Sequence, residues 1–474
     1  MGLSNFERTA RDLISRRHLL RRILLAAGIP VLASRFTEAG PVISTGLDPR
    51  FLEKLRNCLP EDTLFFHAGI SFGSMRELTG GDLLHISTQR RERTLSRDGG
   101  KSWDAPQPLL TVSGETLKGE GRPEGGNPSL LQLESGGLAL VYSKKTADPA
   151  HNHTVWFSRS DDGAASWSPP RKISEPYNNA WKFHNSAIVT SRGRIVVPVF
   201  TLVGKSLKER GRALFDDGPA LIGHHGWEEF FAYCWAYYSD DEGRTWKTNT
   251  GKGVWAAGGE LFATVDHSSG GHYQTTEPSV VEVAPDHLLM LLRTPLGRLY
   301  QSWSEDDGAS WSRPEPSPVA SALAPPAVER IPGTHELLLV WNQSSAEEIR
   351  QGLQRHRLSS AISRDGGASW ESRPNVFSTF QKADGRIRIE PPPIRFYRAR
   401  ERASRLPPND LEGTYPSIAF WKDTVLVSFM CRERSYYSLD SEGRTGYDHL
   451  PGQRGTTTHV CVALPLSRFR GGAA

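Results

Sequence analysis

Apolar residues along this chain gather in short runs, and turns rich in Gly, Asp and Ser separate them. The runs come in pairs. A polar residue followed by Pro-Ser, or by a variant of that dipeptide, opens the first run, and a Gly or Asp turn leads to the second. Short apolar runs bounded by turn residues predict β-strands. The paired stretches are 127–131 with 138–142, 184–189 with 194–199, 277–281 with 288–293, 327–330 with 337–342, and 415–419 with 425–429.

An octet with the frame Ser-x-Asp-x-Gly-x-Ser/Thr-Trp recurs five times between these pairs. Its Asp carboxylate can accept hydrogen bonds from backbone N–H groups of the same turn, and its Gly supplies a position with positive φ. The Trp can cover the turn and pack inward. Each octet therefore predicts a tight hairpin turn. The copies are Ser96–Trp103, Ser160–Trp167 (with Ala164 in place of the Gly), Ser239–Trp246, Ser304–Trp311 and Ser363–Trp370.

The spacing of the octets predicts the fold. Their Trp residues lie 64, 79, 65 and 59 positions apart, which suits four-stranded propeller blades with long loops. A pair of runs without an octet, near 415–429, and a last apolar run at 458–464 complete the pattern. With a first blade beginning near Thr63, we expect an all-β fold, a six-bladed β-propeller with the octets at its turns. We expect the terminal strand to close the ring against the first blade.

The chain divides into three predicted parts: residues 1–40, 41–60 and 61–474. In the first, Ser15–Leu20 resembles a twin-arginine export signal, and the apolar stretch that follows is too short to be a stable membrane anchor. We therefore expect cleavage and export, to the periplasm or outside the cell. The second part predicts a short amphipathic helix, and the third is the propeller. Two insertions, at about 201–232 and 371–412, are expected to wall a site or cap a face.

The charge and the cysteine content of the chain restrict the kinds of ligand and partner that it can have. A net charge of +4 over 474 residues, with no long basic run beyond the N-terminus, argues against nucleic acid and suits a small anionic ligand better. The four cysteines are far apart and lack metal-ligand spacing, so we expect buried thiols, no disulfide framework, no metal and no cofactor.

The innermost strand of each blade lines the central channel, so the polar residues at the start of the paired runs should face one cavity. Arginines close to inner strands could hold a carboxylate there by bidentate hydrogen bonds. The candidates are Asn127, His184, Asn185, Glu277, Asn342 and Tyr415, with Arg76, Arg293 and Arg355, and with Arg357 as a competitor for the place of Arg355.

The octets resemble the Asp boxes of the sialidase (BNR-repeat) superfamily, over about residues 60–468, and the spelling of the runs is most similar to its divergent BNR-like branch. The resemblance implies that Arg76, Arg293 and Arg355 form an arginine triad that clamps the substrate carboxylate. It implies Tyr415 as the nucleophile and Glu277 as the carboxylate that activates it, because a free phenol with a pKa of about 10 needs a neighbouring base.

The sequence departs from that family in two places. The Arg-Ile-Pro spelling around the first arginine is absent, and residues 89–93 carry no aspartate that could serve as acid/base. The general acid is therefore unassigned, with Asp82, Glu92, Glu124 and His184 as candidates.

The function expected from the resemblance is an exported sialidase-like glycoside hydrolase that acts on terminal acidic sugars of glycans, with a carboxylate-bearing glycan as its partner. A polysaccharide lyase acting on uronates would use arginines to neutralise the carboxylate and a Tyr or His to move a proton. A non-catalytic carbohydrate-binding propeller is the third alternative. The same residues serve the hydrolase and the lyase chemistry.

Overall fold

The computed structural model divides the chain into Met1–Ala39 and Gly40–Ala474, and all described residues belong to the second unit. The predicted export segment, residues 1–40, lies outside them. The structure describes residues 42–44, 46–70, 73–88, 90–117, 122–123, 128–145, 153–174, 180–182, 185–203, 212–215, 218–221, 231–249, 265–266, 272–273, 275–380, 385–395, 397, 399, 407, 409–433, 438–439, 445–446 and 456–471.

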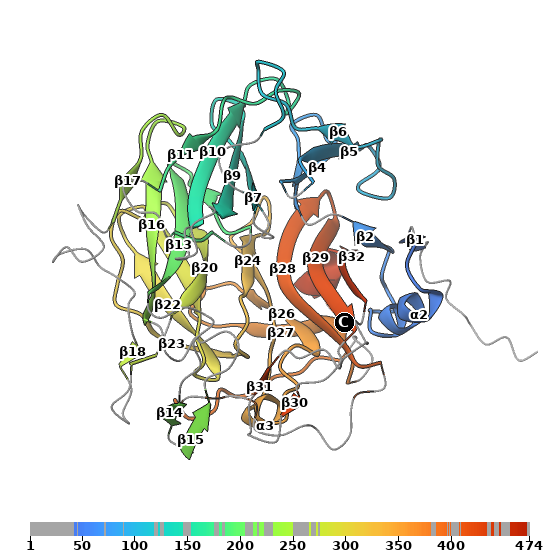
Figure 1. The fold of residues 1–474 in the computed structure, drawn as a ribbon, viewed down its shortest axis with the longest axis vertical. Coiled ribbons are helices and arrows are strands. Elements are labelled where there is room, and N and C mark those ends of the chain that lie inside the picture. The colour runs from blue at the N-terminus through green and yellow to red at the C-terminus, as the bar shows by residue number, and fades with distance from the viewer. Residues whose placement is uncertain are drawn as a thin grey trace, which may run out of the picture. The chain divides into compact units, whose positions relative to one another are not determined.

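Six sheets make up this unit, and they lie around a common axis in Figure 1. Five of them follow one another along the chain, and each begins with its inner strand except the second, in which the short strand β7 precedes the inner strand β8. The first contains β3 (Ser74–Glu77), β4 (Leu83–Ser87), β5 (Glu92–Ser96) and β6 (Gln107–Pro108); the second β7 (Arg122–Pro123), β8 (Ser129–Gln132), β9 (Leu138–Lys145), β10 (His153–Ser160) and β11 (Arg171–Lys172); the third β12 (Ile188–Val189), β13 (Ile195–Val203), β16 (Phe231–Ser239) and β17 (Lys247–Thr248); the fourth β20 (Thr276–Ala284), β21 (His287–Arg293), β22 (Arg298–Ser304) and β23 (Glu315–Ala320); the fifth β24 (Ala327–Arg330), β25 (Leu337–Trp341), β26 (Arg357–Ser363) and β27 (Glu371–Ser378).

The sixth sheet joins both ends of the described chain. Its order is β28 (Leu411–Trp421), β29 (Thr424–Glu433), β32 (Thr457–Pro465), β2 (Phe65–Ile70) and β1 (Val42–Ser44). The remaining described elements are short: β14 (Arg212–Phe215) with β15 (Gly218–Leu221), β18 (Val265–Asp266) with β19 (His272–Tyr273), β30 (Ser438–Leu439) with β31 (Thr445–Gly446), and the helices α2 (Pro49–Asn57), α3 (Ala346–Arg350) and α4 (Ser467–Arg470).

The inner strands form a closed ring. Each contacts the next, from β3 through β8, β12, β20, β24 and β28 and back to β3. The prediction of a six-bladed β-propeller is therefore confirmed.

Closure of the ring joins the two strands that the sequence predicted, but in the last blade and not in the first. The terminal strand β32 lies inside the last blade, between β29 and β2, and does not pair with the first blade. The strand predicted to open the first blade is β2, which belongs to the last one. Its antiparallel pairing with β32 joins two segments about 390 positions apart in sequence, such as Phe65 with Ala463. Hydrogen-bonded pairing between the two ends thus closes the propeller within one sheet.

All five Asp boxes adopt the same turn, as expected. In the box that begins at Ser239, Oγ of Ser239 donates to Asp241 and accepts from Gly243 N, while Asp241 accepts from the backbone and hydroxyl of Thr245. The fifth residue of each box has positive φ, from 71° at Ala164 to 97° at Gly367. Burial raises the pKa of Asp98, but hydrogen bonds from Ser102 and Ser96 outweigh it and bring the pKa to about 2. The carboxylates therefore fasten the turns.

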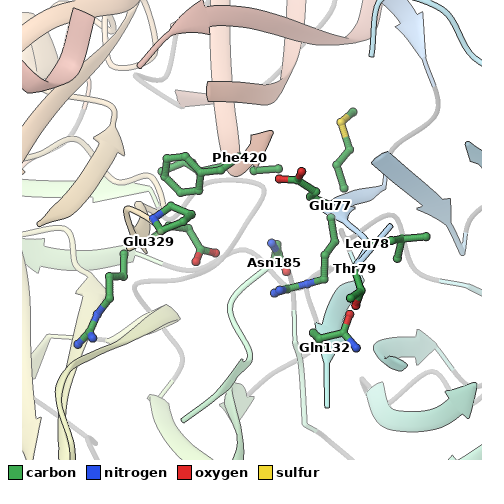
Figure 2. Close-up of a pocket in the computed structure, with 13 residues that line it drawn as sticks. Glu77, Leu78, Thr79, Gln132, Asn185, Glu329 and Phe420 are labelled. Carbon is green, nitrogen blue, oxygen red and sulfur yellow. The ribbon is translucent and has the colours of Figure 1, made fainter. Parts of the chain in front are cut away.

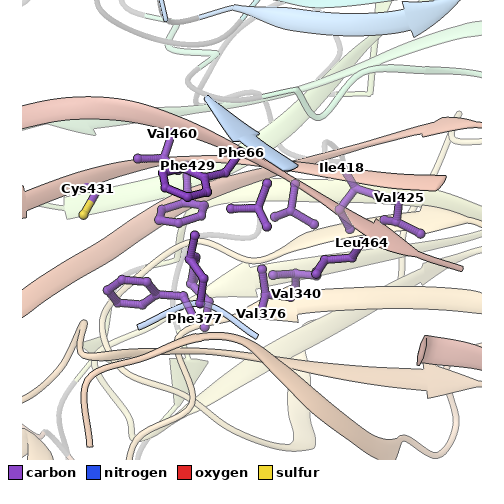
Figure 3. Close-up of a cluster of buried hydrophobic side chains, with 14 of the residues drawn as sticks. Phe66, Val340, Val376, Phe377, Ile418, Val425, Phe429, Cys431, Val460 and Leu464 are labelled. Atoms are coloured by element: carbon purple, nitrogen blue, oxygen red, sulfur yellow. The ribbon is translucent and has the colours of Figure 1, made fainter. Parts of the chain in front are cut away.

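The largest hydrophobic cluster lies between the fifth and sixth blades (Figure 3). It is built from the alternate inward residues of their strands, including Val340, Phe377 and Phe429. The expected N-terminal helix is present as α2, capped by Asp48, and it buries Phe51 and Leu55 in this cluster. The helix thus stabilises the blade in which the ring closes.

The two predicted insertions are only partly described. In the first, β14 and β15 form a small hairpin. The second begins with β27, the outer strand of the fifth blade, so that part is not a loop. Beyond it, the backbone of Ile387 and Ile389 bonds to the Gln343 amide, and Ile394 packs against the hydrophobic cluster of the fourth blade. All four cysteines are buried and free, and no described helix has the length and apolar character of a bilayer span.

Candidate functional site

Four of the predicted site residues come together at one end of the channel. Arg293, the last residue of β21, forms a buried ion pair with Glu277 of β20. The guanidinium carbon of Arg355 lies 5.3 Å from the centre of the Tyr415 ring. Both Arg355 and Tyr415 are close enough to Arg293 to shift its pKa. The fourth, fifth and sixth blades thus contribute two guanidiniums, a carboxylate and a phenol to one cluster.

Glu277 and Tyr415 are presented by matching bulges in two inner strands. Each residue precedes a proline, and the strand pairing shifts register there, between Thr276 and Ser279 and between Thr414 and Ser417. Proline lacks the N–H that regular pairing would use, so it is tolerated at a bulge. Both residues have positive φ, 44° for Glu277 and 56° for Tyr415. A bulge of this kind re-aims a side chain, and bulges are frequent beside active sites.

Burial within the cluster is uneven. Glu277, Arg293 and Arg355 are each at most 4% exposed, whereas Tyr415 is partly exposed. The charged groups are therefore shielded from bulk water, which strengthens their interactions, while the phenol stays within reach of a ligand.

The electrostatics of the cluster centre on Arg293. Burial disfavours its charged form, but the negative charge of Glu277 and the proximity of Tyr415 raise its pKa above the ordinary value, despite the neighbouring Arg355 cation. Arg293 therefore remains a fixed positive charge. Among the described residues, two guanidiniums lie close to one carboxylate, and guanidinium groups suit binding of an anionic ligand.

The backbone of Arg355 is pinned to the strand that carries Tyr415. Gly413 N donates to the carbonyl of Arg355 (2.9 Å), and Asn342 Nδ2 donates to the carbonyls of Gly413 and Arg357 (2.8 Å each). Asn342 was expected to bind substrate, but its side chain is fully buried and donates to these backbone groups. It acts here as a brace between the fifth and sixth blades.

Arg355 and its competitor Arg357 are separated by their partners. Arg357 donates to the carbonyl of Gln343 and forms an ion pair with Glu348 (2.9 Å). Glu348 belongs to the capping box that starts α3, with Ser345 as the N-cap. Arg357 thus anchors the helix that precedes the site, and Arg355 is the arginine beside Tyr415.

Arg76 does not join this cluster. It lines a cavity of about 370 Å³ elsewhere along the channel, together with Asn185, Glu329 and Ala419 (Figure 2). We call this space the far-end cavity. Ala419 lies four residues beyond Tyr415 on β28, roughly 13 Å along an extended strand at ~3.3 Å per residue. The predicted triad therefore reduces to two arginines among the described residues, and Asn185 likewise belongs to the far-end cavity.

Other candidates lie elsewhere or outside the described residues. Asn127, His184 and Glu124 are not described. Asp82 bonds through its carbonyl to Leu78 N in the turn between β3 and β4, away from the cluster. Glu92 begins β5 and lies 3.7 Å from Arg90. The general acid therefore stays unassigned, and Asp82 and Glu92 remain candidates among the described residues.

The sequence analysis did not select two residues that the structure shows to be unusual, Glu329 and Lys182. Glu329 is a carboxylate on the inner strand β24, and the signal that could have revealed it is a charge in an otherwise apolar inner run. Lys182 is 2% exposed, and burial holds its pKa well below the ordinary value. Its signal was weaker, since it follows a Trp in a stretch without regular pattern. No group of three or more potential metal ligands occurs among the described residues.

Comparison with solved structures finds matches of low sequence identity. A protein of unknown function from Dyadobacter fermentans DSM 18053 is 16% identical, with a TM-score of 0.48, and the match covers 84% of this chain and 95% of that one. A Hadza microbial sialidase is 14% identical, with a TM-score of 0.48 and coverage of 86% and 67%. The Trypanosoma rangeli sialidase is 12% identical, with a TM-score of 0.44 and coverage of 84% and 55%. Among curated proteins, none matches the sequence.

The sequence profile of the BNR repeat-like domain matches residues 76–427. That range contains all five Asp boxes, the inner strands β3 to β28 and the cluster around Arg293. The chain therefore belongs to the BNR repeat-like family, a sialidase-like group of propellers.

Proposed function

We propose that this protein is a sialidase-like glycoside hydrolase that removes terminal acidic sugars from glycans. One observation carries the proposal: Arg293, Arg355, Glu277 and Tyr415 meet at one end of the channel, on three different blades. A phenol beside a carboxylate and two guanidiniums suits attack on an anionic sugar, since a neutral nucleophile avoids repulsion by the substrate carboxylate.

Each group has a role in the proposed reaction. Arg293 and Arg355 hold the substrate carboxylate through charge-assisted hydrogen bonds. Tyr415 Oη attacks the anomeric carbon and forms a glycosyl–tyrosine bond as the glycosidic C–O bond breaks, while Glu277 accepts the phenolic proton. The leaving oxygen takes a proton from a general acid, and water then releases the sugar from Tyr415. The positive φ at Glu277 and Tyr415 supports these roles, because backbone strain is concentrated at functional sites.

The experiment compares substrates and one variant. The full chain is incubated with a fluorogenic sialoside and, separately, with uronate-containing polysaccharides. Release of the fluorophore supports the hydrolase, whereas a rise in ultraviolet absorbance from an unsaturated uronate would show a lyase, and binding without turnover a carbohydrate-binding module.

Tyr415→Phe tests the nucleophile. Removing a group that forms the covalent bond should lower kcat by at least about 10³-fold while thermal unfolding stays unchanged. Turnover within a few-fold of the unmodified enzyme would remove Tyr415 from this role. Arg293→Lys should weaken the binding of acidic ligands far more than that of neutral ones, because lysine cannot donate two parallel hydrogen bonds to a carboxylate.

Location is a further part of the proposal. The twin-arginine-type segment in residues 1–40 would carry the enzyme out of the cytoplasm, where it would meet carboxylate-bearing glycans. Changing Arg16 and Arg17 to Lys should retain the protein in the cytoplasm, and fractionation of expressing cells measures this.

A further inference from the structure

The far-end cavity is separate from the proposed catalytic cluster. None of Glu277, Arg293, Arg355 and Tyr415 lines it. Its walls come from later positions on the inner strands, such as Glu329 on β24 and Phe420 on β28. Its volume of about 370 Å³ falls within the usual size range of small-molecule sites, ~300–1,000 Å³. A molecule bound here would not occupy the place of a sugar at Tyr415.

Two of the charged side chains that line this cavity already form hydrogen bonds with backbone groups of the protein. Arg330 donates through Nη2 and Nε to the carbonyl of Glu282, at 2.6 and 3.1 Å. Glu77 accepts a long hydrogen bond from Lys422 N (3.4 Å). The guanidinium of Arg330 is thus held by two hydrogen bonds to the protein, and one carboxylate oxygen of Glu77 is held by a single long one.

Arg76 and Glu329 differ from these two. Arg76 uses Nε to donate to the carbonyl of Leu130 (2.7 Å), which fixes the plane of its guanidinium. In the described part of the chain, no other group accepts from Arg76, and Glu329 has no hydrogen bond or direct ion pair. The two charges sense each other across the cavity, since each shifts the pKa of the other. A cation of the first blade and a carboxyl group of the fifth blade thus face one space.

The rest of the lining is of two kinds. Asn185 and Glu329 point into the space in Figure 2, and Phe420 closes one side. Leu78 and Pro332 add further apolar surface. A ligand that bears only a carboxylate would pair with Arg76 and leave its negative charge facing Glu329. A ligand that bears only an amine would meet the reverse problem. A zwitterion satisfies both ends and leaves an apolar tail for the remaining wall.

We propose that the far-end cavity binds a small zwitterion with an apolar tail, of the α-amino-acid class. Its carboxylate pairs with the Nη atoms of Arg76, its ammonium group with Glu329, and its tail lies against Phe420. This site is independent of the proposed hydrolase reaction.

The test is calorimetric titration of the purified full chain with three matched compounds at pH 8. L-leucine carries both charges, 4-methylpentanoate lacks the amine, and isopentylamine lacks the carboxylate. Leucine should bind at least tenfold more tightly than either of the others. Equal affinity for leucine and one of the single-charge compounds, or no detectable heat with leucine, overturns the proposal.

Variants locate the site. Glu329→Gln keeps the shape of the side chain. It should lower the affinity for leucine at least tenfold and leave the affinity for 4-methylpentanoate unchanged. Arg76→Gln should weaken both, and because Arg76 also bonds to Leu130, its fold is checked by thermal unfolding. Tyr415→Phe is the control and should bind leucine as the unmodified protein does. Unchanged leucine affinity in Glu329→Gln would contradict the assignment, whatever the result of the hydrolase assay.

Discussion

Glu277 and Tyr415 hold backbone conformations that residues other than glycine seldom adopt, and each is followed by proline, which restricts it further. Such strain costs about 1–3 kcal/mol per residue and persists only where the surroundings enforce it. Here the register shifts in β20 and β28 enforce it. At the scale of the residue, the site is thus built by bending two strands at the same kind of dipeptide.

Arg355 and Arg357 offer a test in which one arginine controls for the other. Arg355→Gln removes a charge beside Tyr415, so turnover of an acidic substrate should fall by about 100-fold or more, with little change in thermal unfolding. Arg357→Gln breaks the pair with Glu348, so it should lower the free energy of unfolding by roughly 2–4 kcal/mol. Enzyme kinetics and urea unfolding measure the two effects. The opposite pattern would exchange the two roles.

Glu329 gives stability a dependence on pH. Its pKa is raised to about 7, chiefly because burial disfavours the charged form, with Arg76 acting in the other direction. The carboxyl of Glu329 also faces Arg330 and Glu77 around the cavity, and the remaining lining is uncharged. A folded chain that holds this proton more tightly than the unfolded chain loses stability as pH rises from its ordinary value, 4.5, to about 7.

Glu329→Gln should remove that loss. At pH 8 the variant should be more stable than the unmodified protein by about 1–3 kcal/mol, and the difference should vanish near pH 4. Urea unfolding at both pH values measures it. Parallel pH profiles for the two proteins would show that Glu329 is not desolvated.

The placement of Arg76 shows where sequence reasoning failed. In the repeated pattern, Glu277 and Tyr415 stand two residues before a serine, whereas Arg76 stands two residues after Ser74. A difference of four residues along an extended strand is roughly 13 Å. The cluster of Glu277, Tyr415, Arg293 and Arg355 could be predicted from the sequence. A residue-proline dipeptide or the end of a strand showed at which height along the channel its members lie. No such mark preceded Arg76.

At the scale of the element, each Asp box also joins two blades. Glu242, in the box of the third blade, accepts from Ser135 N and pairs with Arg159, both of the second blade. A side chain at Gly243 would meet the ring of Phe157. The boxes of the first, fourth and fifth blades pack in the same way on the blade before them. The box therefore locks a turn and fixes the angle between neighbouring sheets.

Two glycine substitutions separate these effects. Gly243→Ala puts a methyl group on Phe157 at a residue with φ of 88°, so it should cost about 2–5 kcal/mol of unfolding free energy. Gly163→Ala has similar φ, 67°, but open space around it, so it should cost only about 1–2 kcal/mol. Thermal and urea unfolding compare them, and equal losses would mean that the contact with Phe157 is unimportant.

The boxes and paired strands were predictable because their chemistry is local. Ser, Asp, Gly and Trp within eight residues determine a turn, and alternating apolar runs determine the strands beside it. The contact between the terminal run and the strand near Phe65 was expected from ring closure, but the place of both strands in the last blade was not, since no local signal states which sheet a distant strand will join. The bulges at Glu277 and Tyr415 were likewise not predicted from the sequence, although the proline that follows each residue indicates its position.

At the scale of the whole molecule, closure depends on β2. A chain that begins at residue 61 keeps β2 but loses α2 and the edge strand β1, so Phe51 and Leu55 leave the core and stability should fall by about 3–6 kcal/mol. A chain that begins at residue 73 also lacks β2, leaves the edge of β32 unpaired, and should aggregate or lose cooperative unfolding. A chain that begins at residue 40 is the control. Cooperative unfolding of the residue-73 chain at the control temperature would show that β2 is dispensable.

Because β2 pairs with β32, this early-made strand has β1 beside it but lacks its second neighbour until about 390 further residues have been synthesised. While the intervening blades are synthesised, one edge of β2 remains unpaired. A message cut short would yield a protein with a bare strand on either side of a gap, ready for proteases or for another chain. The fold thereby depends on whether translation continued through β32.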